Sequence, residues 1–192
     1  MNRLNSLTCH RRSVLAAILV SLLAPPARAE YINLSWDDCG AAGVSNKTFA
    51  CDTNVGAPFV LIGSFQPPPG LNRYLGFNGL ISLTTSSATL PDWWKHGAGE
   101  CRGTSGLSLI FDYSGATACS NLYSPGSTGG FAFDVGFGGV NKARLRVQGL
   151  LPNEVALNPG TEYYGFKFLV SRSNTVGAGA SAGCNHDVGL VL

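Results

Sequence analysis

The sequence predicts an all-β protein: an antiparallel two-sheet sandwich, jelly-roll-like or immunoglobulin-like, that is stapled by disulfides. Three observations predict this fold. The 192 residues include 25 glycines and only 12% charged residues, a composition typical of turn-rich β domains. Short apolar runs alternate with turns rich in Gly, Pro and Asn. After the first 29 residues, no stretch of about twelve residues has the period of an amphipathic helix.

Residues 1–29 have the composition of a secretory signal peptide. Arginines precede an apolar run at 14–23, and Ala27 and Ala29 form a small-residue cleavage site. The apolar run is about half as long as a membrane-spanning helix. We therefore expect export by the general secretory route, because the residues flanking the arginine pair do not fit the twin-arginine pattern. Cleavage would leave a single β-sandwich domain at 30–192, secreted or periplasmic, without membrane insertion.

The charge of the mature chain argues against nucleic acid as a partner. Four of the thirteen Lys and Arg residues lie in the leader, whereas all eleven Asp and Glu residues follow it. The mature chain therefore carries a net charge of about −2 and has no basic stripe that would neutralise phosphates. The partners left open are a surface glycan or another protein.

The strands are expected in the following order. Period-two alternation predicts the first at 31–36. An apolar run predicts another at 58–65, which ends where three prolines follow at 67–69. Further strands are expected at 46–51, 74–85, 107–113, 131–137, 143–149, 162–171 and 188–192.

Two local features are expected within this pattern. One helical turn is predicted at 90–95, where Pro91 suits the first position. The strand at 162–171 alternates strictly, so one of its faces should point into the core. That inward face would consist of Tyr164, Phe166, Phe168 and Val170.

Five cysteines follow the leader, and in an exported chain they indicate disulfides. Sequence leaves many pairings open, but short loops favour Cys39–Cys51 and Cys101–Cys119, each contributing about 3 kcal/mol. Cys184 would then be a free thiol, an intermolecular link or the remnant of a lost bridge. No C-x-x-C pair is present, so a zinc site is not expected.

Trp93 and Trp94 are the most suggestive candidate for ligand binding. Adjacent indoles on an exposed loop would stack on sugar rings, which would make the chain a carbohydrate-binding module. Buried indoles would instead close one end of the sandwich, and this is the favoured interpretation because Trp is usually well buried.

Acidic side chains offer a possible calcium site. Asp37, Asp38, Asp52 and Asn54 flank the expected Cys39–Cys51 bridge, and clustered oxygens bind Ca²⁺. Asp and Asn are also common turn residues, and this interpretation is preferred. We expect no metal and no cofactor.

Candidate catalytic residues are few. His96 and His186 are the histidines that follow the leader, and neither lies in a known catalytic motif. Cys184, His186 and Asp187 are too close together in an extended segment to converge. Glycosidases use paired carboxylates, but no spacing supports the pairs that Glu100 would form with Glu154 or Glu162.

Taken together, the residues predict an exported, non-catalytic structural or interaction protein that binds through loops at one end of the sandwich. A carbohydrate-binding module using Trp93 and Trp94 is the first alternative, and an extracellular hydrolase is the second.

Several sequence blocks also carry a resemblance. They are INLSWDDCG at 32–40, NKTFACDTN at 46–54, LPDWW at 90–94, VGFGG at 135–139, ARL at 143–145 and GTEYY at 160–164. Together they resemble a group of uncharacterised secreted bacterial proteins over nearly the whole mature chain, which implies export and a disulfide-bearing β domain. Similar chains carry further cysteines near Gln148, Ser181 and Gly189. The resemblance implies that Cys184 has lost a partner at 189 and that a 148–181 pair was lost from both ends.

Overall fold

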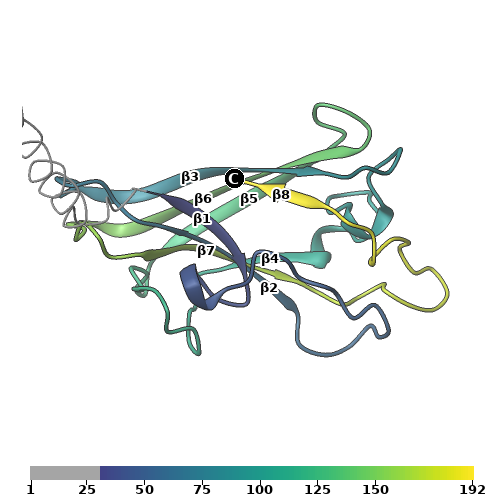
Figure 1. Cartoon of the computed structure of the whole chain (residues 1–192), viewed down its shortest axis with the longest axis horizontal. Coiled ribbons are helices and arrows are strands. Elements are labelled where there is room, and N and C mark those ends of the chain that lie inside the picture. Colours follow the sequence, from purple (N-terminus) through teal and green to yellow (C-terminus); the bar gives the residue numbers. More distant parts are fainter. Residues whose placement is uncertain (1–30) are drawn as a thin grey trace, which may run out of the picture.

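The computed structural model describes residues 31–192, so the expected signal peptide lies outside the described residues. The predicted fold class is confirmed. Two four-stranded antiparallel sheets, ordered β1-β2-β7-β4 and β5-β6-β3-β8, make up this part of the chain and lie face to face (Figure 1). The strands are β1 (Ile32–Trp36), β2 (Phe59–Phe65), β3 (Tyr74–Thr84), β4 (Leu107–Ile110), β5 (Thr128–Val135), β6 (Lys142–Val155), β7 (Tyr163–Val170) and β8 (Gly189–Val191).

The connections give the sandwich its jelly-roll character. Within residues 31–192, β1 and β2 follow one another in the same sheet, as do β5 and β6, and every other connection crosses between the sheets. This repeated crossing is nearer to a jelly roll than to an immunoglobulin domain. None of the helices in the described part is long and apolar enough to cross a membrane.

Most expected strands are present, with three differences. Residues 46–51 form no strand, since they pair with no other segment among the described residues, although the Phe49 ring stacks 4.1 Å from that of Phe59. Strand β4 ends at Ile110, earlier than expected, and β6 continues to Val155. Pro152 is tolerated there because it lies beyond the stretch of β6 that pairs with β5.

The expected helical turn is confirmed as a 3-10 helix, η3 (Asp92–Trp94), which Pro91 precedes. Its two tryptophans belong to the main core between the sheets, together with Phe166, Phe168 and Val170 of β7. Three of the four side chains expected on the inward face of β7 therefore lie there.

Tyr164 is the exception, and a β-bulge is the reason. The register between β2 and β7 shifts at Gly63/Ser64, so that Gly165 has no opposite residue. An extra residue reverses the alternation beyond it. Tyr164 therefore lies in a separate cluster with Ile62 and Tyr113, on the outer face of the first sheet, while Tyr163 joins a third cluster with Tyr74.

Candidate functional site

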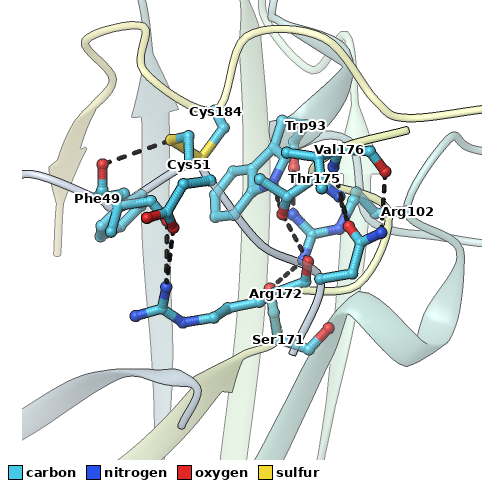
Figure 2. Close-up of a disulfide and its surroundings, with 12 residues drawn as sticks. Phe49, Cys51, Trp93, Arg102, Ser171, Arg172, Thr175, Val176 and Cys184 are labelled. Carbon is cyan, nitrogen blue, oxygen red and sulfur yellow. Dashed lines mark hydrogen bonds and ion pairs between the residues drawn. A yellow bond between two sulfur atoms is a disulfide. The ribbon is translucent and has the colours of Figure 1, made fainter. Parts of the chain in front are cut away.

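The cysteines of the described residues pair across the fold and not along the chain. The disulfides are Cys39–Cys119 and Cys51–Cys184, so the expected pairs Cys39–Cys51 and Cys101–Cys119 are wrong. Loop length was a poor guide because the sandwich brings distant segments together. The first bridge joins two segments that cover the outer face of the first sheet. The second joins the loop before β2 to the loop before β8, as Figure 2 shows.

Bridges between distant residues constrain the unfolded chain more strongly than local ones. The sequence separations are 80 and 133 residues. By chain entropy these correspond to about 4.5 and about 5 kcal/mol, compared with about 3 kcal/mol for the expected local loops. The two bridges are therefore a major source of stability.

Cys101 is the free cysteine of the described residues, and it is exposed. Its Sγ lies in contact with Oγ of the buried Ser181. The expectation that Cys184 has lost its partner is therefore wrong, because Cys184 is bonded to Cys51. The loss of a 148–181 pair stays a prediction.

The Trp93–Trp94 pair lies inside the protein. The two residues are 0% and 5% exposed, so neither presents an indole face to a sugar ring. Trp93 donates its Nε1 hydrogen to Thr175 Oγ1 at 3.0 Å, and the Arg102 guanidinium lies 4.1 Å above its ring (Figure 2). The burial of the two indoles argues against the alternative that they bind a ligand. They close one end of the sandwich, as the favoured interpretation held.

A buried guanidinium, that of Arg102, and a buried imidazole, that of His96, lie near these tryptophans. Arg102 is fully buried and donates to the carbonyl oxygens of Trp93 and Ser171. Burial lowers the pKa of Arg102 to about 10. Burial, and secondarily the charge of Arg102, lowers the pKa of His96 to about 3. His96 is therefore a neutral core residue at pH 7 and a poor candidate for a general base.

The acidic side chains considered for calcium binding point to different partners. Asp37 forms an ion pair with Lys47 at 2.6 Å, and Asp38 accepts from the Tyr164 hydroxyl at 2.8 Å. Asn54 accepts from the amides of the 171–188 loop. One group of metal-ligand type, Cys39, Cys119 and Glu162, lies together among residues 31–192. Its two sulfurs are joined in a disulfide, so it offers no thiolates to a metal.

The carboxylates considered for glycosidic cleavage lie on different parts of the sandwich. Glu154 forms an ion pair with Arg73 at 2.7 Å, and Glu162 accepts from Ser64 at 2.6 Å. Glu100 lies before β4, which pairs with the end of β7, whereas Glu162 precedes the start of β7. The eight residues of β7 span roughly 25 Å, well beyond the separation that glycosidases use.

The remaining candidates for catalysis are also separated or engaged. The His186 ring lies 3.3 Å from Ser87 Oγ. Cys184 is bonded to Cys51 and has no thiol to donate. The structure thus brings none of the expected catalytic sets together.

An open region lies along one side of the sandwich, between β1 and the β3–β8 edge. Strand β3 has eleven residues, but β8 pairs only with its last three, Ser82–Thr84. Beyond the end of β8, a groove of about 550 Å³ opens between the sheets. Its lining includes Tyr31 and Ile32, where β1 begins, residues 77–80 of β3, and Phe166 of β7. We call this the edge groove.

The edge groove is apolar and partly exposed. Ile32 is 71% exposed at its rim, whereas Leu80 alternates with the core residue Ile81 and so points to the outer face of its sheet. The Phe166 ring packs directly over Gly63, at a position where any larger side chain would collide with it. The ring also stacks on Phe77 at 5.8 Å. An aromatic floor therefore lies beside the exposed Ile32 side chain.

A second cavity of about 590 Å³ lies on the same side, between β1, the segment 45–49 and β8. Its lining includes Lys47 and His186, and both already have partners within the chain. Its lining also includes Ser45, Asn46, Thr48 and Asn185, so this cavity is more polar than the edge groove.

No protein-family model, curated protein or solved structure matches the chain. The assignment of a site therefore depends on the geometry alone. Sequence reasoning missed the edge groove, since it follows from the strand order. The one sequence signal was the unequal length of the runs at 74–85 and 188–192, which becomes informative only when the two strands are known to be neighbours.

Proposed function

We propose that this chain is an exported, non-catalytic interaction protein that binds its partner in the edge groove. The observation that carries the proposal is an apolar groove that opens between the sheets beside an incompletely paired strand. Contiguous exposed apolar surface in a folded domain is a feature of protein-interaction sites and ligand-binding grooves.

Export is supported by three independent features. The first 29 residues have the pattern of a signal peptide. The two disulfides are of the kind that persists in oxidising compartments. The resemblance to secreted bacterial proteins points the same way. We therefore place the protein in the periplasm, on the cell surface or in the medium.

The loops at one end of the sandwich, first expected to be the binding region, are less suited to this role. They hold the buried tryptophans and the Cys51–Cys184 bridge. The buried state of the tryptophans also favours the interaction protein over the carbohydrate-binding module, since no indole face is free.

The test is photo-crosslinking from the rim of the edge groove in cells that export the protein. A benzophenone side chain at Ile32 should form a covalent adduct with one partner protein. The matched control places it at Val140, which is 70% exposed but lies in the β5–β6 turn. The partner, identified by mass spectrometry and purified, should bind Ile32→Lys at least about tenfold more weakly than Val140→Lys. Equal binding by the two variants, or adducts from Val140 alone, would refute the proposal.

A further inference from the structure

The free edge of β3 runs along the edge groove. Strand β6 pairs with β3 over its whole length, whereas β8 covers only Ser82–Thr84 on the other side. Among residues 31–192, no strand pairs with the outer edge of 74–81. In an antiparallel strand, alternate residues direct their N–H and C=O groups to each side. About four residues of β3 therefore direct unpaired backbone groups toward the groove.

This edge also lacks the usual protection against pairing. Natural edge strands carry charged residues or proline that discourage another strand. The segment 74–81 reads YLGFNGLI and contains neither. Its irregularity, a register shift between Tyr74 and Gly76, leaves the stretch from Phe77 to Ile81 regular.

We propose that the occupant of the edge groove is an extended peptide strand of a partner protein, which adds to the sheet beside β3 in line with β8. This inference depends on the proposed function and names its partner class. The existing ladder supplies the register: Val191 lies opposite Ser82 and Leu190 opposite Leu83. A strand that continues this line would lie opposite 74–81 and pair antiparallel with β3.

The shape of the groove selects a strand over other occupants. A strand beside β3 would point every second side chain between the sheets, onto the Phe166 floor and toward Ile32. A small apolar molecule would fill the groove but leave the β3 edge unpaired. A second copy of the chain, joined edge to edge, would pair the strands but leave the groove empty. A partner strand with apolar residues at alternate positions would both pair with the β3 edge and fill the groove.

The first test uses synthetic peptides and the exported, oxidised protein. The probe is an octapeptide of alternating Thr and Val with lysines at both ends. Two matched controls carry N-methyl groups on one or the other alternate set of backbone amides, which removes donors without changing the side chains. We expect one control to bind at least about tenfold more weakly than the parent, because its amides face β3, and the other to bind like the parent. Equal binding of all three peptides, or none, would overturn the inference.

The second test is hydrogen exchange on the same complex. Adding the parent peptide should slow exchange of alternate amides within 75–81, and the Ile32→Lys variant should require at least about tenfold more peptide for the same effect. The edges of β4 and β5 should not change. Protection that rises with protein concentration alone would instead show a second copy as the occupant. If purified partner binding distinguishes Ile32→Lys from Val140→Lys but the amides of 75–81 stay unprotected, the inference fails and the proposed function stands.

Discussion

The two ends of the space between the sheets differ in how completely their apolar side chains are buried. At the loop end, Trp93 has a hydrogen-bond partner and a cation over its ring, and a disulfide ties the surrounding loops together. In the edge groove, apolar side chains such as Ile32 are exposed, and the β3 edge beside them is open. The comparison teaches that aromatic residues alone do not mark a binding site. Exposed apolar side chains beside an unpaired strand edge mark it better.

We call the loop end around Trp93 the closed end. Removal of the Cys51–Cys184 bridge should lower its stability more than any other change considered below. The double variant Cys51→Ala/Cys184→Ala should lose about 5 kcal/mol of the free energy of unfolding, because the bridge closes a loop of 133 residues. Denaturant unfolding measures the loss, with Cys39→Ala/Cys119→Ala as the matched comparison at about 4.5 kcal/mol. A loss below about 1 kcal/mol would show that the loop end does not depend on this bridge.

Truncation of one apolar residue in each region sharpens the contrast. Trp93→Ala should cost about 4 kcal/mol, because the side chain is fully buried and leaves a large cavity. Ile32→Ala, at the exposed groove rim, should change stability by no more than about 0.5 kcal/mol. Both values come from urea unfolding of the oxidised protein. Similar losses for the two variants would contradict the distinction between a closed and an open region.

The sequence was sufficient for the fold class and for most strands, because period-two alternation directly reports which face is buried. It misplaced Tyr164, since one bulged glycine reverses the alternation without altering composition. It also mispaired the cysteines, because loop length carries no information about which segments the sheets bring together. The edge groove was beyond sequence reasoning for the same reason: it exists only because a long strand and a short strand are neighbours.

Acid should weaken the closed end through His96. Its pKa is lowered to about 3 in the folded state, whereas in the unfolded chain it is about 6.5. The unfolded state therefore binds the proton first, so the contribution to stability is complete above pH 6.5 and is lost as the pH falls toward 3. At pH 4 the loss attributable to this residue is about 3 kcal/mol.

The matched variant for this effect is His96→Gln, which cannot titrate. Its free energy of unfolding should fall less steeply than that of the parent between pH 6.5 and pH 4, with the difference growing as the pH decreases. Parallel curves would mean that His96 is protonated as easily in the folded protein as in the unfolded chain. The edge groove includes no histidine, Asp or Glu in its lining, so peptide affinity per folded molecule should stay constant over this range.

A gain in stability is expected from a third bridge, at the boundary of the closed end. The Sγ atom of Cys101 already contacts Oγ of Ser181, so Ser181→Cys should form a third bridge. The loop would span 80 residues, but engineered bridges seldom deliver the full entropic effect, and we expect about 2 kcal/mol. Ser181→Ala is the control, since it removes the hydroxyl and leaves Cys101 free. Thiol titration should find no free thiol in the exported Ser181→Cys protein and one in the control. Two free thiols would mean that the side chains at 101 and 181 do not meet as the contact implies. Cys101 would then lie outside the closed end.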